Sequence, residues 1–146
     1  MGASSKEEKI RKELIQLIMD KIGVRENEIL PDADIEHDLG CTGDDFDELI
    51  QAYAKRLNVD MTGYVWYFHA HEESMATVNP ILGNPPSQQV ERIPITLDLL
   101  VDKALLGRWD IRYPIHSLRP RYTLWDKTIC GLFILLLIFF MIRSCM

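Results

Sequence analysis

The chain has 146 residues, the size of one ordinary domain, which nearly excludes a two-domain enzyme. Apolar residues make up 47% of it, enough for a packed core, so general disorder is excluded too. The formal net charge is −6, and an acidic chain is poorly suited to phosphate backbones, which argues against a nucleic-acid partner.

Charge is unevenly distributed along the chain. Residues 1–60 hold 15 acidic residues against 8 Lys and Arg, whereas residues 113–146 hold 1 against 4. Ten acidic residues and no Lys or Arg lie between Glu26 and Glu48. The two ends are therefore expected to meet different surroundings.

Helical spacing predicts a first helix that opens at Ser4 and Ser5. Ser5 and Glu8 match a capping box, and Gly23 is placed to end the helix. Its apolar stripe comprises Ile10, Leu14, Leu17, Ile18 and Ile22. An acidic loop is expected over residues 24–38.

A second helix is predicted with Thr42 as its N-cap and Asn58 as its terminator. Its apolar stripe comprises Phe46, Leu49, Ile50, Tyr53 and Leu57. Four acidic residues crowd its first turns, where they complement the helix dipole: Asp44, Asp45, Asp47 and Glu48.

The middle of the chain is less regular. Residues 63–71 are aromatic and short, and we predict an irregular or short helical segment there. Residues 74–94 contain three prolines before Pro94, and we predict a long loop there. Thr96 then caps a last helix, Leu97–Leu106, which Gly107 ends. Its inward face comprises Leu97, Leu100, Val101 and Ala104.

The C-terminal part predicts a membrane anchor. Residues 129–142 carry no charge, and eleven of these fourteen are Leu, Ile or Phe. We expect a basic linker over 113–123, a transmembrane helix over 124–143 and a short tail over 144–146. Positive residues before the span predict a single-pass inner-membrane protein with a cytoplasmic N-terminal domain, the bilayer being one of its partners.

The fold class expected is mainly α, with a tail over 1–5 and a helical domain over 6–112, here called the head. Asp38-Leu39-Gly40, the acidic second helix and Glu48-Leu49 stand where acyl carrier proteins have similar residues. The head therefore resembles an acyl-carrier-like helical bundle with residues 74–94 inserted. With Trp66-Tyr67-Phe68-His69 and Gly107-Arg108-Trp109, it looks more like an uncharacterised bacterial family of such proteins.

The resemblance fails at one decisive position. Gly43 stands where acyl carrier proteins have the serine that bears the phosphopantetheine arm, and glycine has no oxygen to form the phosphodiester. The chain is therefore expected to carry no such cofactor. What the resemblance still implies is an acidic docking face, formed by Asp44, Asp45, Asp47 and Glu48, for a cytoplasmic or membrane protein with a basic surface.

Other residues are weaker candidates for chemistry. His69 and His71 could share one face of a strand and form half of a metal site, although the sequence shows no third ligand. We therefore expect no metal site. Cys41, four residues after His37, is expected to be a free thiol rather than a nucleophile.

The leading hypothesis is a non-enzymatic, membrane-tethered protein-binding module with a degenerate acyl-carrier-like domain. Two alternatives stay open: an acyl or peptidyl carrier with an unusual attachment site, and a small membrane immunity or inhibitor protein that acts through residues 74–94. A metal-dependent enzyme ranks last.

Overall fold

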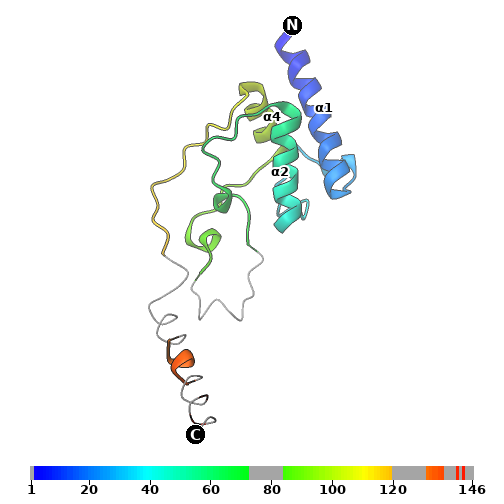
Figure 1. Ribbon diagram of the computed structural model, residues 1–146. Coiled ribbons are helices and arrows are strands. Elements are labelled where there is room, and N and C mark those ends of the chain that lie inside the picture. The colour runs from blue at the N-terminus through cyan, green and yellow to red at the C-terminus, as the bar shows by residue number, and fades with distance from the viewer. Residues whose placement is uncertain (1, 73–83, 120–130, 137–140, 142, 144–146) are drawn as a thin grey trace.

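The structure is a computed structural model that describes residues 2–72, 84–119, 131–136, 141 and 143 (Figure 1). The described chain is mainly helical, as predicted. Its elements, with η denoting a short 3-10 helix, are α1 (Gly2–Ile22), η1 (Glu26–Glu28), α2 (Gly43–Leu57), η2 (Trp66–Phe68), η3 (Pro86–Gln89) and α4 (Leu97–Leu106).

Helix α1 confirms the predicted stripe but not the predicted start. Ile10, Leu14, Leu17 and Ile18 are buried, and Gly23 follows the helix with a φ of 75°. Ser5 lies inside the helix rather than at its N-cap, so the predicted capping box is wrong. The Glu8 carboxylate instead accepts a hydrogen bond from Lys12 Nζ at 2.7 Å, one turn further on.

Helix α2 begins and ends where the sequence predicts. Thr42 is the N-cap, although its side chain makes no capping hydrogen bond, and Asn58 ends the helix in the left-handed conformation. Phe46, Leu49, Ile50 and Tyr53 are buried. Tyr53 also donates its hydroxyl to the Leu100 carbonyl oxygen at 2.9 Å, which fixes α2 against α4.

Helix α4 matches its predicted bounds and caps. The Thr96 hydroxyl accepts a hydrogen bond from the Leu99 N–H, and Gly107 takes the left-handed conformation after the helix. The predicted inward face is buried: Leu97, Leu100, Val101 and Ala104.

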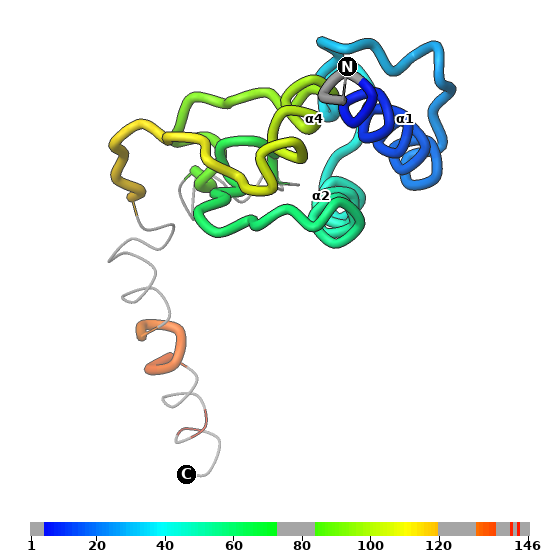
Figure 2. Tube along the Cα trace, turned by 90° about the horizontal axis from the view of Figure 1, so that it is seen from above, coloured from blue at the N-terminus to red at the C-terminus, as the bar shows by residue number. Residues whose placement is uncertain are grey.

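Helix α1 packs against both α2 and α4, and the three helices group together (Figure 2). Their apolar faces meet in one core, which also takes in Ile35, Ile95 and Trp109 from the connecting segments. The irregular segments beside the helices are held by backbone contacts. The Ile35 N–H donates to the Ile95 carbonyl at 2.9 Å, and the Trp109 N–H donates to the Asp60 carbonyl at 2.7 Å.

The two irregular regions of the sequence contain short helices. Element η2 lies within the predicted irregular segment 63–71, and η3 lies within the predicted loop 74–94. Residues 74–83 of that loop lie outside the described residues. The described part of the loop, from residue 84, contains η3 and continues to the N-terminus of α4.

The predicted transmembrane helix is wrong. Within the part of the chain that the structure describes, no helix combines the length and apolar character that a membrane crossing requires. The inner-membrane location and the bilayer partner rested on that helix and are withdrawn with it. Residues 124–130, 137–140 and 142 of the predicted span lie outside the described residues.

Candidate functional site

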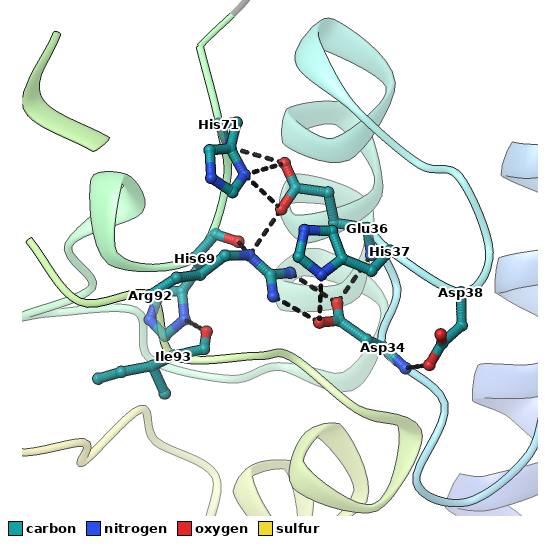
Figure 3. Close-up of polar contacts among 8 residues, drawn as sticks. All are labelled: Asp34, Glu36, His37, Asp38, His69, His71, Arg92 and Ile93. Atoms are coloured by element: carbon teal, nitrogen blue, oxygen red, sulfur yellow. Dashed lines mark hydrogen bonds and ion pairs between the residues drawn. The ribbon is translucent and has the colours of Figure 1, made fainter. Parts of the chain in front are cut away.

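A cluster of charged side chains lies where the loop before α2 meets the segment before α4 (Figure 3). Both guanidinium Nη atoms of Arg92 bond the two carboxylate oxygens of Asp34, with Nη2 donating to Oδ1 at 2.6 Å. Arg92 Nε lies 2.6 Å from Glu36 Oε2. Only 2% of the Glu36 side chain and 12% of the Asp34 side chain are exposed, so Arg92 neutralises charge that water reaches poorly.

The two carboxyl groups stay ionised in this cluster. Burial by itself would raise the pKa of Asp34, but hydrogen bonds from Arg92 and the Glu36 N–H outweigh it, and the pKa is lowered. Burial also opposes ionisation of Glu36, yet hydrogen bonds from the His71 N–H and ring, with the Arg92 charge, lower its pKa. The cluster therefore holds two negative charges against one positive charge.

Two exposed histidines border the cluster. The His71 N–H donates to Glu36 Oε1 at 2.7 Å, and His71 Nδ1 lies 3.1 and 3.0 Å from the two Glu36 oxygens. The His37 ring stacks on the His71 ring with centroids 5.8 Å apart, and its Nδ1 lies 3.9 Å from Asp34 Oδ2. The side chains of His37 and His71 are 62% and 48% exposed, so solvent ions can reach both rings.

His69 points away from this pair and is fully buried. Its Nδ1 lies 2.8 Å from the Ile93 carbonyl oxygen, and its Nε2 lies 2.7 Å from the Tyr113 hydroxyl. Both ring nitrogens are thus engaged in hydrogen bonds within the protein. The structure therefore separates the predicted pair: His71 lies at the cluster, and His69 is a packed side chain with no nitrogen left for a metal.

The four acidic residues predicted as a docking face all lie exposed near the start of α2. Glu48 pairs with Lys21 at 3.1 Å. Within the described residues, Asp44, Asp45 and Asp47 have no hydrogen bond or ion pair from their carboxylates to another side chain. In the described part of the chain, this end of α2 thus presents three carboxylates that no ion pair neutralises.

Two adjoining hollows lie along the same side of α2. One, of about 320 Å³, is lined by Gly43, Asp44, Asp47, Trp66, Ala70, His71 and Glu72. The other, of about 490 Å³, is lined mostly by apolar atoms of Asp47, Ile50, Gln51, Ala54, Lys55, Met61, Tyr64 and Trp66. Asp47 and Trp66 belong to both, so an acidic hollow continues into an apolar one.

Comparison with known proteins places the chain in a family. Residues 7–111 match the sequence profile of DUF1493, described as a protein of unknown function. The chain belongs to the DUF1493 family. No curated protein and no solved structure matches this DUF1493 protein. The resemblance to acyl carrier proteins therefore remains a prediction from the sequence.

Gly43 occupies the corner at which α2 begins and lines the acidic hollow of this DUF1493 protein. Its φ of 57° lies in the left-handed region, which favours glycine over any residue with a side chain. Gly43, which the predicted resemblance aligns with the serine of acyl carrier proteins, thus adopts a backbone conformation that a serine would occupy at a cost of about 1 kcal/mol.

Cys41 is buried and has no features of a nucleophile. Burial, followed by the nearby charges of Asp45 and Glu36, raises the pKa of its thiol to about 11. The thiolate is the reactive form, so this cysteine is unreactive near neutral pH.

Glu36 and Arg92 were not predicted as site residues from the sequence, and His37 was considered only beside Cys41. Glu36 was one acid among ten, and Arg92 stood at the end of a long loop, 58 residues from Asp34. The one local signal was that His37 lies in a stretch, residues 26–48, whose Asp and Glu residues are accompanied by no Lys or Arg. Nothing in the spacing joined that stretch to residues 69–71 or 92.

Proposed function

We propose that the head of this DUF1493 protein is a non-enzymatic protein-binding module. Its docking surface consists of the two hollows beside α2 and the exposed carboxylates of Asp44, Asp45 and Asp47. The partner is a protein whose surface places basic side chains next to apolar ones. The observation that carries the proposal is the continuity of an acidic hollow with an apolar hollow through Asp47 and Trp66.

The apolar hollow supplies the area that binding needs. Trp66 is 40% exposed although it is large and apolar, and it stands between the two hollows. Partly exposed tryptophans at the centre of a concave surface are typical of residues that dominate binding energy. A partner's aliphatic or aromatic side chain against Trp66, Met61 and Ile50 would remove this surface from water.

The carboxylates supply the selectivity. Asp44 and Asp47 line the acidic hollow, so a partner Lys or Arg can approach them while its apolar neighbour enters the second hollow. Three unneutralised negative charges also repel acidic surfaces, which restricts the range of partners. Charge then governs encounter and specificity, and apolar contact governs lifetime.

The test compares partner capture by three full-length proteins from an extract of the source cells. The first is the native chain, and the second carries Asp44→Asn, Asp45→Asn and Asp47→Asn. The third is a matched control with the same loss of charge elsewhere, Glu26→Gln, Asp32→Asn and Asp102→Asn, all exposed positions. We expect one specific protein with the native chain and the control, and at least tenfold less of it with the α2 variant.

The captured protein is then produced and its Kd measured against the same three chains. A tenfold or larger rise in Kd for the α2 variant alone supports the proposal. Equal binding to the native chain and the α2 variant would place the contact on another surface and overturn it. The absence of any specific partner would overturn it as well.

A further inference from the structure

We propose that Glu36, His37 and His71 bind a divalent transition-metal ion of the zinc type. One donor atom from each of these three residues lies within 4.8 Å of the other two. Two imidazoles and one carboxylate are a donor set that zinc and related first-row ions prefer. This inference does not depend on the proposed function, although His71 also lines the acidic hollow of the docking surface.

The spacing of the strongest pair already suits one metal ion. His71 Nδ1 lies 3.1 and 3.0 Å from the Glu36 oxygens, whereas two ligands of a tetrahedral zinc lie about 3.4 Å apart at bond lengths of about 2.1 Å. A metal ion between these atoms would replace the hydrogen bond with little movement. His37 must approach by about an ångström or more, which its 62% exposed side chain can do by changing rotamer.

The surroundings hold the carboxylate in place as metal sites require. Glu36 accepts the His71 backbone N–H at 2.7 Å on Oε1, and Arg92 Nε lies 2.6 Å from Oε2. Such partners orient a ligand and fix its charge state. Asp34, which bonds the other two Arg92 nitrogens, offsets the repulsion between Arg92 and a cation.

The charge of the cluster also favours a divalent cation. Asp34 and Glu36 contribute two negative charges and Arg92 one positive charge, so the group is left with one net negative charge. Asp38, exposed beside Asp34, accepts a hydrogen bond from the Asp34 N–H at 2.8 Å and adds a second negative charge. A divalent cation neutralises these two net negative charges, whereas an anion would be repelled.

Three protein ligands leave at least one coordination position open. His71 lines the acidic hollow, so the open position lies at the rim of that hollow. Water or a side chain of a bound protein can complete the coordination there. The site therefore supplies a metal-dependent contact next to the docking surface.

The experiment titrates Co²⁺, and then Zn²⁺, into chelator-treated full-length protein. Every arm carries Cys130→Ser and Cys145→Ser, which removes the two thiols outside the described residues as competing ligands. Visible d–d absorption reports Co²⁺ coordination, and calorimetry gives the stoichiometry and Kd for Zn²⁺. We expect one equivalent of metal, with Zn²⁺ displacing Co²⁺.

Three single variants test the assignment. His37→Gln and His71→Gln should each weaken Zn²⁺ binding at least tenfold, because each removes one of three ligands from an exposed position. His116→Gln, which removes an exposed histidine bonded to Tyr67, should leave the Kd unchanged. Circular dichroism on each variant confirms that the fold is intact.

Two results would overturn the inference. One is native protein that binds no stoichiometric Zn²⁺. The other is native affinity retained in both His37→Gln and His71→Gln, which would mean that any bound metal lies elsewhere. Neither result touches the proposed docking surface, whose own test uses Asp44, Asp45 and Asp47.

Discussion

His69 shows how burial fixes the protonation state of one side chain. Its Nδ1 faces the Ile93 carbonyl, which can only accept, so Nδ1 carries the proton and Nε2 accepts from the Tyr113 hydroxyl. The Tyr113 oxygen in turn accepts from Trp109 Nε1 and from the Val65 N–H. Every polar atom of this chain of bonds is satisfied only while the ring is neutral.

This arrangement predicts a loss of stability in mild acid. Burial, assisted by the Arg92 charge, lowers the pKa of His69 to about 4, against 6.5 for a free imidazole. Between those values the unfolded chain binds a proton that the folded chain excludes, so stability falls as pH falls from 6.5 towards 4. We expect His69 to lower the free energy of unfolding by about 2 kcal/mol between pH 7 and pH 5, measured by urea denaturation.

The variant His69→Gln isolates the contribution of His69 to the pH dependence of stability. The variant is less stable at pH 7, because it loses packing and hydrogen bonds, but its stability should change less between pH 7 and pH 5 than that of the native chain. His116→Gln is the control for an exposed histidine and should keep the native difference. An unchanged pH response in His69→Gln would show that other groups cause it.

The charged cluster marks the limit of prediction from residues alone. Cys41 was expected to be a free thiol and is one, because no second cysteine lies nearby in sequence and the described chain buries it. Glu36, His37 and Arg92 could not be predicted as a group, since their meeting depends on how two loops cross. Only tertiary structure brings residues 34–37, 69–71 and 92 together (Figure 3).

Among the elements, the two later α-helices differ in how their N-termini are capped. Thr96 accepts the Leu99 N–H at 3.2 Å at the start of α4, whereas Thr42 at the start of α2 makes no side-chain capping bond. A capping hydroxyl satisfies one of the free N–H groups of a helix N-terminus. Threonine at the N-cap thus stabilises α4 by a side-chain hydrogen bond but makes no such bond in α2.

This contrast gives a matched pair of variants. Thr96→Ala should lower the free energy of unfolding by about 1 kcal/mol, because one N–H of α4 loses its partner. Thr42→Ala should change it by less than about 0.5 kcal/mol. Urea denaturation at neutral pH measures both. A larger loss in Thr42→Ala than in Thr96→Ala would contradict the capping assignment.

Helical periodicity predicted the elements whose apolar faces are buried. Helices α1, α2 and α4 each carry a stripe at helical spacing, and the stripe faces the common core in all three. The first residues of α1 carry no such stripe, so the start of this helix was predicted from a capping motif alone. That motif placed the start at Ser4 and Ser5, whereas α1 begins at Gly2. Segment 63–71 packs through closely spaced aromatic rings with no single period, so its form depended on tertiary contacts.

At the scale of the whole molecule, some of the acidic side chains form ion pairs and others do not. Acidic residues of α1 pair with nearby bases, as in Arg11–Glu7, Lys12–Glu8 and Arg56–Glu13. Among the residues that the structure describes, the start of α2 forms no such pair apart from Lys21–Glu48. A negative field is therefore expected beside the two hollows, where the docking surface is proposed.

That field predicts how association depends on salt. Raising the ionic strength from about 0.01 M to about 0.15 M shortens the Debye length from about 30 Å to about 8 Å. A basic partner is then attracted over a shorter range, so its association rate with the native chain should fall several-fold. The dissociation rate should change little, since contacts with Trp66 and the apolar hollow control it. Stopped-flow or surface-binding kinetics with the captured partner measure both rates.

The triple variant Asp44→Asn, Asp45→Asn and Asp47→Asn separates local charge from net charge. It should associate more slowly than the native chain at low salt and respond less to added salt. The control Glu26→Gln, Asp32→Asn and Asp102→Asn has the same net charge but should keep most of the native response, because its removed carboxylates do not line the hollows. Equal salt responses in the two variants would mean that net charge alone steers the encounter, and the start of α2 would then have no special part in it.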